Sequence, residues 1–230
     1  HLNLFTLTGG PAFAVDGTIN SVNIGKGANS VAGNTVLGEG ALDASVTGDD
    51  NTAVGKNALT LNTSGASNTA LGRRTLQTQT TGSFNTAVGT SALKNSTTSS
   101  NNTAVGFDSL GANTTGASNT ALGTNALDAN TTADNNTAVG KDALTTNSTG
   151  SGNTAVGKGA SLGNTTGTDN TAVGLSALYT NSTGGDNVAV GRSALENNTT
   201  ASNNTAVGHD SLKANTTGAD NNAFGSGALD

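Results

Sequence analysis

The pentapeptide Asn-Thr-Ala-Val-Gly, or a close variant of it, recurs along the chain every 17 residues. The Asn that opens each unit stands at positions 34, 51, 68, 85, 102, 119, 136, 153, 170, 187, 204 and 221, so twelve units follow one another without an insertion or deletion. Globular proteins tolerate loops of different lengths between their elements. A chain that keeps its repeat length fixed is stacking identical structural units, as solenoid proteins do.

The composition favours a thin, extended core over a compact one. Apolar residues make up 33% of the 230 residues, aromatic residues 3% and charged residues 10%. Disordered chains are also poor in large apolar residues, but they do not keep a Val or Leu in phase over twelve units. We therefore expect a rod to which every unit contributes only one or two large core side chains.

The consensus unit is N-T-A-V-G-x-x-A-L-x-x-N-T-T-G-x-x, and its residues are called positions one to seventeen. Positions one to four predict a short strand, because β-branched residues alternate there with a small one. The Ala-Leu pair at positions eight and nine predicts a second short buried strand. The glycine at position five and the Asn-Thr-Thr-Gly run predict two corners. The expected fold is all-β: a parallel β-solenoid, or β-roll, with one 17-residue repeat per turn.

Departures from the consensus indicate which face of the first strand is buried. Position two is once Val188, position four is always apolar, and the lead-in before the first unit places Val22 and Ile24 at the matching positions. We therefore predict that positions two and four point into the core, although Asn222 at position two disagrees. On this interpretation position four forms one internal column and the Leu at position nine a second, and the alanine at position three points outward.

A single coil of this kind buries little apolar surface. Each large side chain contributes about 2–3 kcal/mol when buried, whereas ordering one residue of backbone costs roughly 1–2 kcal/mol. We therefore expect self-association, as a homotrimer in which the outward alanines, such as Ala53, Ala87 and Ala138, lie near the contact between chains.

Two columns of residues are predicted to hold successive turns in register. Glycines at position five would form corners that exclude a side chain: Gly38, Gly55, Gly72, Gly89, Gly106, Gly123, Gly140, Gly157, Gly174, Gly191, Gly208 and Gly225. Asparagines at position one would stack as amide ladders: Asn51, Asn68, Asn85, Asn102, Asn119, Asn136, Asn153, Asn170, Asn187 and Asn204. The twelve-unit rod spans residues 34–230, with its last unit incomplete, and residues 1–33 form an N-terminal junction or cap.

The charged residues suggest one surface feature. Basic residues gather at position six, where they could form a stripe for anionic glycans or act only as solvated corner residues: Lys56, Arg73, Lys141, Lys158 and Arg192. The net charge of −6 argues against nucleic acid as a partner.

Known site patterns are absent from the sequence. There is no Cys, no Gly-Gly-x-Gly-x-Asp calcium repeat and no pair of His at metal-ligand spacing, so no metal, cofactor or enzymatic activity is expected. No run approaches the roughly 20 apolar residues of a membrane helix. Asn-Thr/Ser-Thr/Ser triplets at position twelve, as at Asn62 and Asn113, match the N-glycosylation pattern, although a role in the turn is sufficient to explain them.

The repeats over residues 34–230 resemble those of bacteriophage tail-fibre proteins, in which Asn-Thr-Ala-Val-Gly units are separated by Asn-Thr-Thr-Gly turns. The pentapeptide is also similar to the Ser-Val-Ala-Ile-Gly motif in the heads of trimeric autotransporter adhesins, which are left-handed parallel β-rolls. Those adhesins use a shorter repeat, and Thr here replaces their first Val.

These resemblances imply a structural function. We expect a segment of a phage tail fibre in the virion that projects a receptor-binding tip for host attachment. Its partners would be further copies of itself, other tail or fibre proteins, and a host-surface glycan or protein. The alternative is the head or stalk of a bacterial adhesin or extracellular filament at the cell surface. A third class, ice-binding solenoids, uses rows of Thr on a flat outer face and is disfavoured here because Thr at position two is predicted to point inward.

Overall fold

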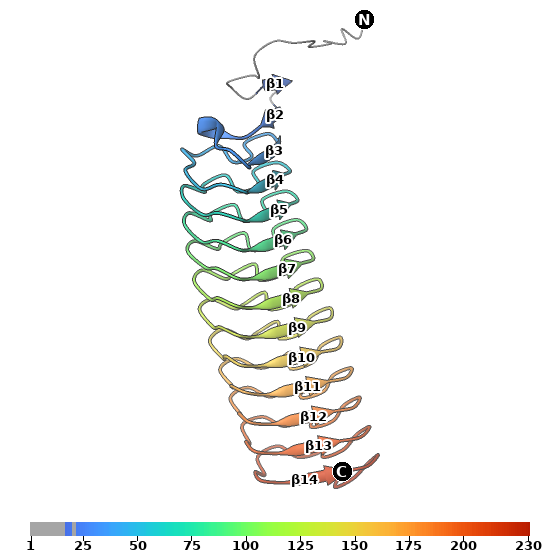
Figure 1. The fold of residues 1–230 in the computed structure, drawn as a ribbon. Coiled ribbons are helices and arrows are strands. Elements are labelled where there is room, and N and C mark those ends of the chain that lie inside the picture. Colours follow the sequence, from blue (N-terminus) through green and yellow to red (C-terminus); the bar gives the residue numbers. More distant parts are fainter. Residues whose placement is uncertain (1–16, 20–21) are drawn as a thin grey trace, which may run out of the picture.

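The computed structural model describes residues 17–19 and 22–230, and in this part the chain forms a parallel β-solenoid with about 11 turns of about 17 residues. Figure 1 shows the turns stacked as a rod, with the strands in one column along it. This confirms the all-β class and the match of one repeat to one turn. Residues 1–16 and 20–21 of the predicted junction lie outside the described residues.

In the described part of the chain, one sheet of fourteen strands runs in sequence order along the rod. Its strands are β1 (Gly17–Ile19), β2 (Val22–Gly25), β3 (Thr35–Gly38), β4 (Thr52–Val54), β5 (Thr69–Leu71), β6 (Thr86–Val88), β7 (Thr103–Val105), β8 (Thr120–Leu122), β9 (Thr137–Val139), β10 (Thr154–Val156), β11 (Thr171–Val173), β12 (Val188–Val190), β13 (Thr205–Val207) and β14 (Asn222–Phe224). From β3 onward every pair is parallel, and each residue lies beside its counterpart 17 positions away, as Ala138 lies beside Ala155.

The first described turn is covered by chain running in the opposite direction. Strand β2 pairs antiparallel with β3, and β1 pairs antiparallel with β2. Between β2 and β3 lies η1 (Ala28–Ser30), a single 3-10 turn, and the backbone N–H of Ala28 bonds to the carbonyl of Leu42. The part of residues 1–33 that is described therefore packs on the end of the coil.

The prediction for the strand face is wrong. The alanine at position three is fully buried in its own coil, as Ala53, Ala87 and Ala138 show, whereas positions two and four point outward and are half-buried or exposed. The coil is so thin that a methyl group fills the space inside the strand in every unit but the first, where Val36 stands. The alanines therefore contact their own core and no second chain, and the residues at position four form an outer column.

The prediction of a second strand at positions eight and nine is also wrong. This stretch is a turn in the described units, and its Leu adopts a left-handed conformation, with φ 50 at Leu144 and φ 53 at Leu178. The Leu side chain is nevertheless buried. The backbone N–H of the same Leu bonds to the position-eight carbonyl of the next turn, as Leu144 bonds to Ala160 at 3.0 Å. The internal column of Leu is thus present without strand geometry.

Candidate functional site

The most regular surface of the rod is the outer face of the sheet, built from positions two and four of β3 to β14. We call this face the strand stripe. Position two supplies Thr35, Thr52, Thr69, Thr86, Thr103, Thr120, Thr137, Thr154, Thr171, Val188, Thr205 and Asn222; position four supplies Leu37, Val54, Leu71, Val88, Val105, Leu122, Val139, Val156, Val173, Val190, Val207 and Phe224. No member is charged, so the stripe is an uncharged band that follows the sheet along the rod.

The stripe leaves both apolar surface and polar groups without partners. Leu71 and Leu122 are 46% and 42% exposed, and Phe224 is 71% exposed. Within the described residues, the Thr hydroxyls at position two have no hydrogen-bond partner in the chain. A row of exposed apolar side chains along one face is a candidate interaction surface.

Polar columns inside the coil hold the strands of the stripe in register. At position one, the Asn119 Oδ1 accepts a hydrogen bond from the Asn136 backbone N–H at 3.0 Å, and the Asn136 Nδ2 donates to the Gly150 carbonyl at 2.9 Å. The same bond from the backbone N–H to the Oδ1 one turn before recurs from Asn51 to Asn221. These side chains are buried except at the last turn. Every predicted ladder residue therefore acts as a substitute backbone acceptor.

A second column of buried amides, at position twelve, was not anticipated as a ladder. From Asn130 to Asn215, each Nδ2 donates one hydrogen bond to the Oδ1 of the Asn one turn before and another to the position-fifteen carbonyl of its own unit. Asn62 and Asn113 in this column are 0% exposed. An oligosaccharide cannot be attached to these amides in the folded chain, so the glycosylation-like triplets serve the turn. The Asn that recurs at position twelve was the sequence signal from which this ladder could have been predicted.

The glycines at position five lie immediately after the strand. Their φ values run from 125 at Gly225 to 157 at Gly38, a range that L side chains rarely adopt. A Cβ added to Gly140 would lie 2.5 Å from the carbonyl oxygen of Gly157. A side chain is thus excluded from the corner for two reasons: the backbone conformation, and the closeness of the next turn.

The basic residues at position six do not form a continuous stripe. Lys56 and Arg73 lie on consecutive turns, as do Lys141 and Lys158, but Thr90, Phe107 and Thr124 separate the two groups, and Arg192 follows Leu175. Lys56 pairs with Glu39 at 2.8 Å, and Lys141 lies 3.7 Å from Asp142. An extended anionic polymer would therefore meet two short basic segments and one isolated Arg.

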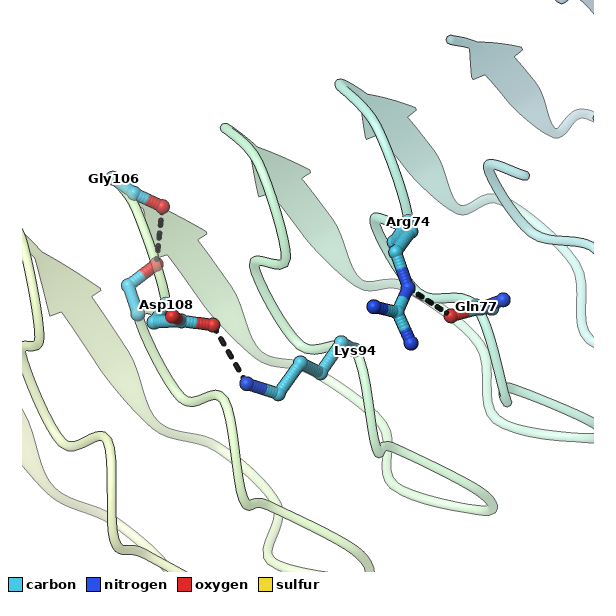
Figure 2. Close-up of polar contacts among 6 residues, drawn as sticks. Arg74, Gln77, Lys94, Gly106 and Asp108 are labelled. Carbon is cyan, nitrogen blue, oxygen red and sulfur yellow. Dashed lines mark hydrogen bonds and ion pairs between the residues drawn. The ribbon is translucent and has the colours of Figure 1, made fainter. Parts of the chain in front are cut away.

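A small cluster of charged and polar side chains lies beyond the corner, at positions seven and ten. Figure 2 shows Lys94 reaching the next turn, where its Nζ lies 2.8 Å from Asp108 Oδ1, and Arg74 donating to Gln77 at 2.8 Å. Burial raises the pKa of the Asp128 carboxyl, the nearby Asp108 raises it further, and Lys94 opposes both. Two carboxylates and one ammonium group leave a net charge of −1 when all are ionised, and no Ser, Cys or His stands among them as a nucleophile or general base.

Among residues 17–19 and 22–230 there is no group of three or more His, Cys, Asp or Glu that could hold a metal ion. In the same residues, no helix has the length and apolar character needed to cross a membrane. Comparison with protein-family models, with curated proteins and with solved structures finds no match to this chain. The strand stripe is therefore the feature on which a functional proposal rests.

Proposed function

We propose that the protein is a structural rod, a fibre segment that assembles with further copies of itself through the strand stripe. The single observation that carries the proposal is the uncharged band at positions two and four, which leaves large apolar side chains in solvent along the sheet. Burying Leu, Val and Phe contributes about 1.5–3 kcal/mol for each fully buried side chain, which supplies the apolar burial that one thin coil lacks.

A parallel homotrimer suits this surface. The stripe is two side chains wide, or about 7 Å along each strand, so three copies can bring their stripes together around a common axis and exclude water from it. The position-two hydroxyls can then bond to one another across the axis. In this arrangement the alanines stay inside each coil, and the outer Val, Leu and Thr side chains make the contacts between chains.

The biological setting extends this proposal. As a tail-fibre segment in a virion, the rod would connect other fibre proteins to a tip that binds a host-surface glycan or protein. As an adhesin or extracellular filament it would do the same from a bacterial surface. The repeat sequence favours the fibre setting by its resemblance to tail-fibre repeats, and the neighbouring genes would distinguish the two: tail genes for the first, a membrane-anchor domain for the second.

Self-association is tested by measuring the mass of the intact chain in solution by light scattering. We expect three times the 22.2 kDa of one chain. Leu122→Asp combined with Val156→Asp should shift the protein toward monomer, because it places carboxylates in the stripe. Leu61→Asp is the matched control, since Leu61 is 49% exposed and lies at position eleven, off the stripe. A monomeric wild type at high concentration would contradict the proposal.

Ice binding is the second candidate, and the outward Thr row favours it. The argument against it, that Thr at position two points inward, is removed by the structure. An outer row of unbonded hydroxyls beside a row of methyl groups, repeating about every 4.8 Å, is a regular surface that could order water. Both functions need the same face, so they are alternatives. A monomer that produces thermal hysteresis, lost in Thr137→Lys with Thr154→Lys, would favour ice binding over the rod.

A further inference from the structure

The strand stripe by itself is a small interface. Twelve strands spaced about 4.8 Å apart give a length of about 55 Å, and a width of about 7 Å gives roughly 400 Å². Stable interfaces bury about 800 Å² on each partner. If self-association is as proposed above, residues on both sides of the stripe must contribute, and their chemistry determines how neighbouring copies are oriented.

The side of the stripe that precedes each strand is acidic. Positions sixteen and seventeen carry six aspartates and no Lys or Arg in the described units, and we call this side the acidic edge: Asp49, Asp50, Asp134, Asp169, Asp186 and Asp220. Asp134 accepts a hydrogen bond from the Ala117 N–H at 2.6 Å. Within the described part of the chain, none of the six is in an ion pair.

The side that follows each strand is basic. Position six carries Lys56, Arg73, Lys141, Lys158, Arg192 and His209, against one acid, Glu39, and we call this side the basic edge. Part of this charge is already paired within the chain: Lys56 with Glu39, Lys141 with Asp142 and His209 with Asp210, whereas Arg73, Lys158 and Arg192 are in no ion pair among the described residues. The three aspartates at the adjoining position seven are also paired. Asp108 bonds to Lys94, Asp142 to Lys141, and Asp210 to both His209 and Lys213.

At three of the described strands, β4, β9 and β12, the two edges carry opposite charges at the same height along the rod. Asp50 precedes β4 and Lys56 follows it, and Asp186 and Arg192 flank β12 in the same way. At β9 the flanking pair is Asp134 and Lys141. Around β6, β7 and β8 neither edge is charged, and the exposed Phe84 and Phe107 lie there instead, one on each edge and one turn apart.

We propose that a second copy of this chain docks parallel and in register, with its acidic edge against the basic edge of the first. When parallel rods meet with their stripes at a common axis, the side preceding the strands of one chain abuts the side following the strands of the next. When antiparallel rods meet face to face about a two-fold axis along the strands, acidic edge meets acidic edge. The charge pattern therefore selects the parallel arrangement, because like-charge juxtaposition disfavours the antiparallel one. The charge-free segment from β6 to β8 favours the in-register alignment, because a shift would place charged residues beside Phe84 or Phe107.

Zero-length carbodiimide cross-linking tests the contact directly. Chains labelled with ¹⁵N are mixed with unlabelled chains, reassembled and cross-linked, and cross-links between a labelled and an unlabelled peptide are identified by mass spectrometry. We expect Lys56 joined to Asp50, Lys141 to Asp134 and Lys158 to Asp169 across chains. Lys56 follows β4 and Asp220 precedes β14, at opposite ends of the rod. A cross-link between these two residues would show that the copies are not aligned in register, and a reassembled protein that gives no cross-link between the two edges would show that the edges do not meet. Either result would overturn the proposal.

Charge reversal provides the second test. One variant reverses the basic edge, with Lys56→Glu, Lys141→Glu, Lys158→Glu and Arg192→Glu, and another reverses the acidic edge, with Asp50→Lys, Asp169→Lys, Asp186→Lys and Asp220→Lys. Each should weaken association at least tenfold at low salt, and the loss should shrink as salt screens the charges. The variant that carries both sets should associate nearly as well as the wild type.

The control adds charge away from the two edges: Asn95→Glu with Asn197→Glu, both exposed at position eleven, should leave association unchanged. If the stripe variants of the preceding section abolish association while neither edge reversal affects it, the rod proposal stands and the edge proposal fails. If the wild type is a monomer at every concentration and salt, both fail.

Discussion

The strand side of the coil and the side opposite it differ in how much sequence change they admit. On the strand side, position one is Asn and position five is Gly in all twelve units. On the opposite side, position twelve is Ser45, Gln79 or Ser96 in three units, and position nine is once Ser161. Positions one, nine and twelve are buried in most units, whereas the invariant position-five glycine is mostly half-buried, so burial alone does not explain the difference.

The two sides of the coil differ in whether their residues are needed to complete the hydrogen bonding and conformation of the backbone. The position-one Oδ1 is the partner of a buried main-chain N–H one turn away, and the position-five glycine holds a φ that only glycine adopts readily. The position-twelve amide bonds chiefly to other amides and to a carbonyl that the position-one amide also serves, as at Gly150. The columns that complete the main chain are invariant, and those that pack or bond side chains vary.

The largest expected effect is at the strand-side corner. Gly140→Val should lower the free energy of unfolding by about 3 kcal/mol per chain, because it combines a disfavoured φ of 136 with a Cβ placed 2.5 Å from Gly157 O. Gly159→Asn is the control, since its φ of 64 suits Asn and the nearest atom to its Cβ belongs to the Tyr179 ring at 3.3 Å. Thermal unfolding followed by circular dichroism measures both, and an equal effect of the two would remove the distinction between invariant and variable glycines.

The two amide columns are compared directly by alanine substitution. Asn136→Ala removes the acceptor of the buried Asn153 N–H and should cost about 2–3 kcal/mol. Asn147→Ala leaves the Asn164 amide bonded to Gly167 O at 3.0 Å and should cost about 1 kcal/mol. Denaturant unfolding gives both values. If Asn147→Ala proves the more damaging, bonding of the backbone is not what fixes position one.

The exception in the Leu column should be improvable. Ser161 is buried, its Oγ has no partner, and it keeps a left-handed φ of 47 like its Leu neighbours. Ser161→Leu should raise stability by about 2 kcal/mol by extending the column between Leu144 and Leu178. Ser161→Ala, which removes the hydroxyl without filling the site, should gain less. The sequence suggested that Leu162 substitutes here, but Leu162 is only half-buried.

The interruption of the position-twelve column provides a smaller gain. Asn62 Oδ1 is buried without a partner because Gln79 donates instead to Ser99 O at 3.0 Å, and Ser96 bonds to both Gln79 and Ser99. Replacing this cluster by the consensus, with Gln79→Asn, Ser96→Asn and Ser99→Gly, should raise stability by about 1 kcal/mol. Gln79→Asn alone should gain less, since it also breaks the bond to Ser96. A loss from the triple variant would show that the cluster is the better solution.

The smallest expected effect concerns Asp128, beyond the corner. Burial raises its folded pKa, so the folded chain binds this proton more tightly than the unfolded chain, and stability falls as the pH rises from 3.8 through the folded pKa. Asp128→Asn should therefore stabilise by a few tenths of a kcal/mol at pH 7, because solvent screens a half-buried group. The gain should disappear below pH 3.8. A gain that is independent of pH would assign the effect to packing.

The sequence by itself determined the class of fold, the repeat length of each turn and the columns that run along the rod. A strict period leaves only stacked, in-register turns, so Ala138 had to lie beside Ala155 and Leu127 near Leu144. The period did not reveal which face of the strand is buried, although the size of the side chains at positions three and four contained a signal for it. Position three admits only Ala and, once, Val36, whereas position four admits Val, Leu and Phe. Tight packing restricts side-chain size, and solvent does not.

Only the tertiary structure decided which face of the strand is buried and how the chain runs after the strand. An alternating pattern fits either face equally well, and the choice depends on how much room the returning chain leaves inside the coil. Here the buried Leu column, reached through a left-handed backbone at positions such as Leu144, leaves room for little more than a methyl group in all units but the first, which has Val36. That geometry places Thr and Val on the outside, where the strand stripe and its two charged edges lie side by side along the rod.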